Sequence, residues 1–247
     1  MSLQPIYPPL VSARVEGRTM KMVQFLEASP LFQSLTLPQL ESISKDVQTR
    51  RFNQGEIIFR EGDPGQVLYL VRSGQVRIFV NGLDGTETSV ILFGRPGDMF
   101  GELAVIDGLP RSATAVALDE TVLYTVSRES FRYHMQRVPQ LALNFLKELT
   151  HRVRYNTRQM DSLASLPVSQ RLARKLLELA QDYGRLEANS VIIDMTLTQT
   201  NLASLVGATR ESANKILRDF RERGLIWFDN GRITILDADA LRAEVTA

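Results

Sequence analysis

The sequence contains no cysteine and only two histidines, His134 and His151. The lack of cysteine excludes disulfides, thiolate zinc sites, cysteine nucleophiles and cysteine-held iron–sulfur clusters. The two histidines are weak candidates for haem ligands, because a lone histidine more commonly packs on a helix or lies at the surface. We therefore expect no metal, no haem and no iron–sulfur cluster.

Long apolar runs and an excess of one charge are also missing. No segment approaches the ~18 apolar residues of a membrane helix, and the first residues lack the continuous hydrophobic stretch of a secretory signal. We therefore expect a cytoplasmic protein. The 29 Lys and Arg nearly balance the 28 Asp and Glu, giving a net charge of +1. Any surface that binds nucleic acid must concentrate its positive charge locally.

The patterns that enzymes require are absent as well. The sequence shows no nucleophile with a base and an orienting group, no cluster of metal ligands and no Walker glycine loop. We expect a binding protein that is not an enzyme, with the regulatory subunit of an enzyme as the alternative. A chain of 247 residues with 44% hydrophobic residues suits two modest cores.

Proline and glycine divide the chain into four predicted parts. Residues 1–20 contain prolines without apolar periodicity and predict a flexible arm. Residues 21–137 contain a helical segment near 31–43 and then short β-branched or aromatic runs between glycine turns, which predicts a barrel or roll. The last two parts are a helix over 138–166 and a second domain over 167–247, which begins at the helix-breaking Pro167.

The predicted helix over 138–166 carries apolar residues at alternating steps of three and four. This spacing is the a/d seam of a coiled coil, and a lone helix with such a seam needs a partner. We therefore expect a homodimer. The predicted seam consists of Leu146, Leu149, Val153, Asn156, Met160 and Leu163.

Residues 100–114, FGELAVIDGLPRSAT, contain an acid and an arginine around a short helical turn. Such a turn directs backbone N–H groups at one point and favours an anion there. Arg111 adds a charged donor fork suited to phosphate, and Ser112 adds a hydroxyl donor. Glu102 accepts hydrogen bonds and suits a ribose hydroxyl. The alternative is that Glu102 and Arg111 form a buried salt bridge that only fixes the turn.

These fifteen residues, which we call the cassette, resemble the phosphate-binding cassette of cyclic-nucleotide-binding domains. The segment GEIIFREGD at 55–63 is similar to the same fold, and the resemblance covers about residues 30–135. It implies a β-roll (jelly-roll) in which Gly101 and Glu102 approach the ribose 2′-hydroxyl. It also implies ligand contacts from Leu103, Arg111, Ser112 and Ala113. Of these, Arg111, Ser112 and Ala113 would hold the cyclic phosphate.

In proteins of the cyclic-AMP receptor type, the purine contacts the dimer helix. Alignment through LPVSQRLARKLL places Asn156 and Thr157 at those positions, where the best-known members carry Thr-Ser. The resemblance implies cyclic AMP as an allosteric effector. Asn156 has a second interpretation, because a polar residue at one seam position sets register and two-strandedness.

Residues 198–223 show the pattern of a helix-turn-helix. Thr198 and Thr209 are acceptable N-caps, and Gly207 separates two short amphipathic stretches. Residues 224–236 then predict a β-hairpin around Asp229-Asn230-Gly231. One face of the second helix is apolar, and the other exposes charged and amide groups that can hydrogen-bond base edges. Simple solvation of that charged face is the alternative.

Residues 168–236 resemble the winged DNA-binding domain of the cyclic-AMP receptor family, with RESANKIL matching its recognition helix. We therefore expect an α+β regulator of the CRP/FNR (cyclic-AMP receptor protein/fumarate-nitrate regulator) family, closest to the cyclic-AMP receptor branch. The resemblance implies palindromic double-stranded DNA with TGTGA-like half-sites, and RNA polymerase as a partner. Another effector or constitutive DNA binding remains the alternative. The expected DNA-contacting residues are Thr198, Thr209, Arg210, Glu211, Ser212, Asn214, Lys215 and Arg218, and Lys215 stands where the best-known member has arginine.

Overall fold

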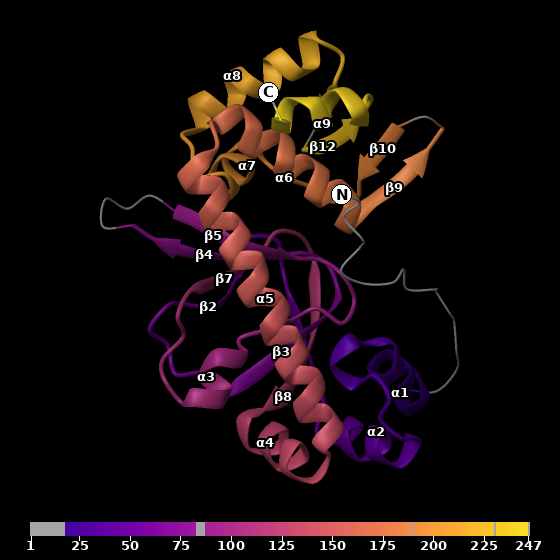
Figure 1. Ribbon diagram of the computed structural model, residues 1–247. Coiled ribbons are helices and arrows are strands. Elements are labelled where there is room, and N and C mark those ends of the chain that lie inside the picture. Colours follow the sequence, from indigo (N-terminus) through magenta and orange to yellow (C-terminus); the bar gives the residue numbers. More distant parts are fainter. Residues whose placement is uncertain (1–17, 83–86, 189, 230, 247) are drawn as a thin grey trace. The chain divides into compact units, whose positions relative to one another are not determined.

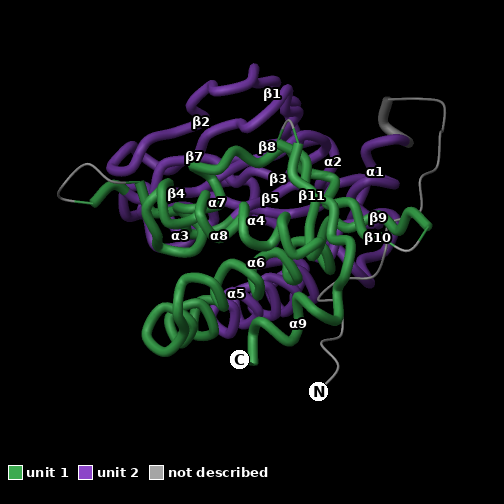
Figure 2. Tube along the Cα trace, turned by 90° about the horizontal axis from the view of Figure 1, so that it is seen from above, with its two compact units in different colours: residues 1–6, 81–91, 156–247 green, residues 7–80, 92–155 purple. Residues whose placement is uncertain are grey.

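The computed structural model describes residues 18–82, 87–188, 190–229 and 231–246. The chain divides into two compact units, coloured separately in Figure 2. Unit 2 comprises residues 7–80 and 92–155, and unit 1 comprises the rest. Most of the predicted arm lies outside the described residues, but its last three residues already belong to a helix.

Helices precede the strands of unit 2 (Figure 1). The helical segment predicted near 31–43 corresponds to a short 3-10 turn and α2. Helix α1 was not predicted, because the neighbouring prolines suggested an arm, yet Val23 and Leu26 on it are buried in the core. The bounds are α1 (Arg18–Ala28), η1 (Pro30–Phe32) and α2 (Leu37–Ser44).

Two four-stranded sheets form the β-roll, as predicted. Strand β3 pairs antiparallel with β8 and β6, and β7 pairs antiparallel with β2 and β4. The two-residue strand β6 was not predicted, because Met99 and Phe100 are too short a segment to form a recognisable β-branched or aromatic run. The first sheet has the order β1 (Gln48–Phe52), β8 (Thr121–Ser127), β3 (Val67–Ser73), β6 (Met99–Phe100), and the second has the order β2 (Ile57–Phe59), β7 (Thr114–Ala117), β4 (Val76–Asn81), β5 (Glu87–Phe93).

Aromatic rings from both sheets meet inside the roll. Phe100 of β6 stacks on Tyr69 with ring centroids 5.0 Å apart, and Phe59 of the second sheet lies 5.6 Å from Tyr69. Phe93 lies 5.8 Å from Phe100. Each large ring buries much apolar surface, so this cluster fixes the sheets beside the cassette.

Two helices, α4 (Arg128–Arg137) and α5 (Pro139–Ser165), follow the roll. The first part of α5 packs on the core of unit 2, where Leu141 and Phe145 are buried and Phe145 contacts Phe131 edge-on at 5.6 Å. Asn144 donates to the backbone carbonyls of Leu31 and Gln33 at 3.1 and 2.8 Å. These contacts bury one face of α5 and leave the opposite face exposed. No described helix is long and apolar enough to cross a membrane.

Unit 1 combines helices with a sheet of order β11-β12-β10-β9. The predicted hairpin is present as β11 and β12, although Asn230 of its turn lies outside the described residues. Strands β9 and β10 and helix α9 were not predicted. The bounds are α6 (Val168–Tyr183), β9 (Gly184–Glu187), β10 (Ser190–Ile193), α7 (Gln199–Leu205), α8 (Arg210–Glu222), β11 (Ile226–Asp229), β12 (Arg232–Ile235) and α9 (Ala238–Thr246).

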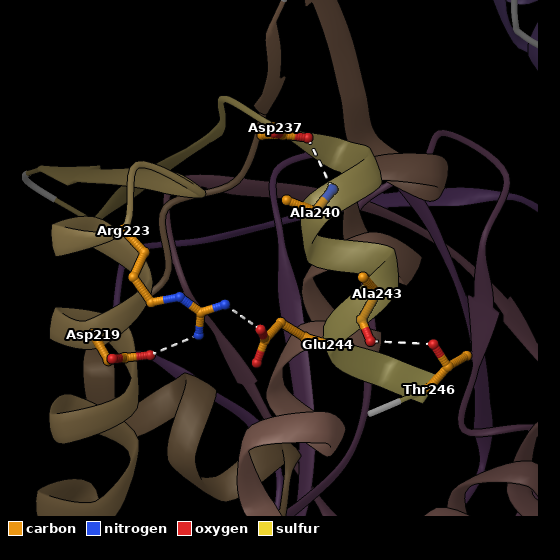
Figure 3. A network of polar contacts seen from close by, with 7 residues as sticks. All are labelled: Asp219, Arg223, Asp237, Ala240, Ala243, Glu244 and Thr246. Carbon is orange, nitrogen blue, oxygen red and sulfur yellow. Dashed lines mark hydrogen bonds and ion pairs between the residues drawn. The ribbon is translucent and has the colours of Figure 1, made fainter.

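Helix α9 is tied to the end of α8 by a polar network (Figure 3). Arg223 Nη1 donates to Asp219 at 3.1 Å, and its Nη2 pairs with Glu244 of α9. Both bonds raise the pKa of Arg223, with the bond to Glu244 as the larger cause. Asp237 caps the start of α9 by accepting from the N–H of Ala240 at 2.9 Å. The network fixes the C-terminal end of α8.

A carboxyl group lies in the loop that leads into β6. Asp98 Oδ2 accepts from the backbone N–H groups of Gly94 and Arg95 at 3.0 and 2.9 Å. Burial raises the pKa of Asp98 from 3.8 to about 6, against the opposing effects of these hydrogen bonds and of Arg95 and Arg152. The folded protein therefore binds a proton at Asp98 at pH values where the unfolded chain has lost it.

Asp98→Asn tests this titration. Because the folded pKa is raised, Asp98 lowers the free energy of unfolding as pH rises from about 4 to about 6, and the full cost is present above that window. The amide oxygen of the introduced asparagine can still accept from the loop without becoming charged. We expect the stability of the variant relative to wild type to increase across this window in denaturant unfolding. A difference that does not change with pH would contradict the raised pKa.

Candidate nucleotide site and nucleic-acid interface

The cassette begins with a left-handed turn between β6 and α3 (Glu102–Asp107). Gly101 has φ of 74°, a conformation that glycine adopts without strain. A Cβ atom at Gly101 would lie 2.5 Å from Nη1 of Arg111. Both the backbone angle and this close approach therefore require glycine here.

Arg111 is held inside the cassette by two carbonyls and two rings. Its Nη1 donates to the carbonyl of Gly101 at 2.6 Å, and its Nη2 donates to that of Val67 at 2.7 Å. The guanidinium carbon lies 4.2 Å from the ring centre of Phe59 and 5.6 Å from that of Tyr69. Arg111 is only 5% exposed, and its Nε has no partner among the described residues. Burial lowers the pKa of Arg111, but an arginine stays charged in proteins.

Glu102, only 4% exposed, pairs with an arginine from outside the cassette. Arg152 Nη1 of α5 lies 2.7 Å from Glu102 Oε1, and its Nη2 donates to the carbonyl of Met99. Sequence reasoning missed Arg152. A signal was available, because Arg152 precedes Asn156 by four residues and so shares its helix face.

The structure does not join Glu102 to Arg111, which was the alternative interpretation of the motif. Within the described residues, Glu102 forms its ion pair with Arg152, and Arg111 donates to backbone carbonyls. The other predicted contacts differ in exposure: Leu103 and Ser112 are exposed, and Ala113 is buried. The cassette thus presents a buried cation and a buried carboxylate without a direct ion pair between them.

Asn156 and Thr157 are both exposed on α5. They belong to unit 1, whereas the cassette belongs to unit 2. Their predicted contact with the purine therefore stays a prediction.

The predicted seam of α5 is largely exposed. Val153 and Met160 are 64% and 70% exposed, and Leu146 and Leu163 are exposed by about half. Leu149 differs, because it is half-buried against the core of unit 2. Exposed Leu143 extends the stripe by one step toward the start of the helix.

Helices α7 and α8 form the helix-turn-helix. Thr198 caps α7 by accepting from the N–H of Asn201 at 3.1 Å, and Thr209 caps α8 by accepting from that of Ser212 at 3.2 Å. Gly207 in the turn has φ of 58°. The two predicted N-caps are therefore the ones that the structure uses.

The exposed face of α8 carries a concentrated charge. Ala213, Leu217 and Phe220 are buried, and Asn214 is half-buried. Two further arginines make contacts within the protein: Arg221 lies 4.2 Å over the ring of Trp227, and Arg223 joins the network with α9. The exposed side chains on the predicted reading face are Arg210, Glu211, Ser212, Lys215 and Arg218.

Comparisons with known proteins match both parts of the chain. Residues 49–138 match the family model of the cyclic nucleotide-binding domain, and residues 170–244 match that of the Crp-like helix-turn-helix domain. The chain is 34% identical over 220 residues to the CRP-like cAMP-activated global transcriptional regulator of Mycobacterium tuberculosis, covering 89% of this chain and 98% of that protein. It is also 34% identical over 217 residues to the cyclic AMP receptor protein of Thermus thermophilus, covering 87% and 96% of the two chains.

Among solved structures, the catabolite activator protein of Thermus thermophilus matches with a TM-score of 0.51 and 32% identity. The match covers 88% of this chain and 99% of that one. A relative with another name is the global nitrogen regulator of Synechococcus elongatus, 31% identical over 205 residues, covering 82% of this chain and 92% of that protein. Since relatives above 30% identity extend along nearly the whole chain, this protein belongs to the CRP/FNR family of DNA-binding transcription regulators, with a cyclic-nucleotide-binding domain and a Crp-like helix-turn-helix.

Proposed function

We propose that cyclic AMP controls DNA binding by this regulator. The observation that carries the proposal is the pair of buried, oppositely charged side chains, Glu102 and Arg111, in one cassette without an ion pair between them. A buried guanidinium whose Nε lacks a protein partner suits an anionic phosphate. A buried carboxylate is an acceptor for a ribose hydroxyl. A cyclic nucleotide supplies both groups.

The adenine would be recognised on α5. Asn156 and Thr157 offer an amide and a hydroxyl, which can hydrogen-bond to the purine and its exocyclic amine. Two relatives whose names refer to cyclic AMP are each 34% identical to this chain. The name of the nitrogen regulator refers to no cyclic nucleotide, and another effector on the same fold is therefore the second candidate.

Arg152 would couple nucleotide binding in the cassette to helix α5. It bonds to Glu102 and to the carbonyl of Met99, so a ribose that binds Glu102 must share or displace one of its contacts. Helix α5 continues without a break from unit 2 into unit 1. We infer that the nucleotide binds more tightly to the α5 arrangement that is competent for DNA, which shifts the population toward it.

The DNA-bound form would be a homodimer. The stripe of Leu146, Val153 and Met160 repeats every seven residues and is exposed, as expected of a seam that a second α5 covers. Two copies of α8 would then enter major grooves one helical turn apart on palindromic DNA. The predicted operator has TGTGA-like half-sites, and RNA polymerase is the predicted partner at promoters.

Arg111→Leu tests the phosphate contact. Charged hydrogen bonds are worth about 1.5–3 kcal/mol each, so two of them predict a loss of affinity for cyclic AMP of roughly 100-fold or more. Isothermal titration calorimetry measures it. Arg132→Leu, an exposed arginine of α4 in the same unit, is the matched control and should bind as wild type does. Equal affinity of wild type and Arg111→Leu would exclude the cassette as the phosphate site.

Val153→Glu tests the seam. The substitution places two unpaired carboxylates at the proposed contact, and an uncompensated buried charge costs about 3–5 kcal/mol. We expect the dimer to dissociate at a concentration at least ~100-fold higher, as measured by analytical ultracentrifugation. Lys147→Glu changes the charge at an exposed residue beside the stripe and serves as the control. An unchanged dimer in the Val153 variant would place the interface elsewhere.

Substitutions of Lys215 distinguish recognition of a base from sequence-independent attraction to the DNA phosphates. We expect Lys215→Ala to weaken operator binding by about 1–3 kcal/mol and to relax the preference at one base pair. Lys215→Arg, which restores a bidentate fork, should sharpen the preference for guanine at that pair. Competition binding against operators mutated at single positions measures both effects. If Lys215→Ala weakened all sequences equally, Lys215 would contact only phosphate.

A further inference from the structure

Arg221 differs from Arg223, its near neighbour at the end of α8. Arg223 is bound to two carboxylates, those of Asp219 and Glu244. Arg221 forms no ion pair within the part of the chain that the structure describes, and its guanidinium carbon lies 4.2 Å from the ring centre of Trp227. Because Arg221 is also exposed, it presents a positive charge without a carboxylate partner to the solvent.

Trp227 holds this guanidinium from the first strand of the hairpin. Ile226 is buried and Phe228 is half-buried, so the alternation along β11 directs Trp227 away from the core. Trp227 is 48% exposed. An aromatic ring attracts a cation placed over its face, and the N–H groups that point away from the ring stay free to donate. The pair therefore presents a positioned donor fork at the surface.

Arg221 lies on the same side of α8 as Arg210. At about 100° per residue, the eleven steps from Arg210 return Arg221 to within roughly 20° of it around the helix. At 1.5 Å per residue they also carry it roughly 16 Å along the axis. The major groove is about 12 Å wide, and a recognition helix contacts base edges with its N-terminal residues. Arg221 therefore lies past the base edges, where the phosphates border the groove.

We propose that Arg221, positioned by Trp227, donates to a DNA phosphate at the edge of the major groove. Arginine suits this contact because its fork can bind two phosphate oxygens at once. A phosphate contact carries no sequence information, but it adds affinity and fixes the position of the protein on the duplex. The contact lies outside the predicted set of DNA-contacting residues, which ends at Arg218.

The salt dependence of DNA binding tests this contact. An arginine in the last turn also stabilises a helix through its dipole, so the test needs a quantity that a merely structural role does not change. The logarithm of the binding constant falls with the logarithm of the salt concentration by about 0.9 for each neutralised phosphate. A dimer that carries Arg221→Gln would lose two such contacts. We therefore expect a slope that is shallower by about 2 in fluorescence anisotropy titrations.

The loss should be the same for every sequence. We expect Arg221→Gln to bind operator and unrelated DNA more weakly by similar factors, roughly tenfold or more near 0.1 M salt. Arg242→Gln removes an exposed arginine of α9 that pairs with Asp239, and this matched control should keep the wild-type slope. Saturating cyclic AMP is present in every titration, so the comparison does not depend on whether the nucleotide controls binding. An unchanged slope in Arg221→Gln would overturn the proposal. A weakening confined to the operator would mean that Arg221 acts through the position of α8, and would overturn it as well.

Trp227 is the only tryptophan of the chain, so its fluorescence reports on this contact in the wild-type protein. At the same concentration of cyclic AMP, we expect operator DNA to protect Trp227 from quenching by acrylamide. Unchanged quenching would place the pair away from the duplex, available to a protein partner instead, and would overturn the proposal. Trp227→Phe keeps a ring beside Arg221 and should bind DNA as wild type does, whereas Trp227→Ala should bind several-fold more weakly. Equal affinity of these two variants would contradict the positioning role of Trp227.

Discussion

Helix α5 reaches the cassette through an ion pair between the half-buried Arg152 and the buried Glu102. Glu102 is nearly inaccessible, and a buried carboxylate is stable only when its charge is compensated. The same arginine bonds to the backbone of Met99, so the helix is anchored at the start of the cassette. A ligand that changes the partners of Glu102 therefore acts directly on α5.

The residues around the Arg152–Glu102 ion pair hold the charged groups of the cassette in place. The rings of Phe59 and Tyr69 hold the guanidinium of Arg111 in place. Gly101 lies so close to this guanidinium that a side chain at position 101 would collide with it. Cation and carboxylate are thus kept in fixed positions before any nucleotide binds, which lowers the cost of ordering the site. In unit 1, the bonds of Arg171 to Leu163 and Gly207 link the end of α5 to the turn before α8. The middle of α5 and its C-terminal end are therefore each attached to one functional element by an arginine.

Much of this could be predicted from the sequence, for physical reasons. Glycine turns and the β-branched or aromatic runs between them predicted the strands of the roll, because those signals are local. Thr198 and Thr209 predicted the starts of α7 and α8, because capping depends on one side chain and the following turn. The charged face of α8 followed from helical periodicity, with Asn214 more buried than that pattern suggests.

The remainder depends on contacts between distant residues. The partner of Glu102 lies 50 positions away on another element, and no local pattern specifies it. The half-burial of Leu149 depends on how α5 packs on unit 2, which the spacing of three and four does not reveal. Strand β9 exposes all four of its residues, so it has no alternating pattern. Helix α9 packs on α6 through the buried Leu241, and no local signal in the sequence indicates that contact.

The most direct test of nucleotide control is a titration of labelled palindromic operator DNA, followed by fluorescence anisotropy at one stated salt concentration. Salt must be fixed because phosphate contacts make affinity strongly dependent on it. Nucleotide control predicts that saturating cyclic AMP tightens operator binding at least about tenfold, corresponding to ~1.4 kcal/mol of coupling, and that cyclic GMP does so less. The same affinity with and without cyclic AMP would contradict it.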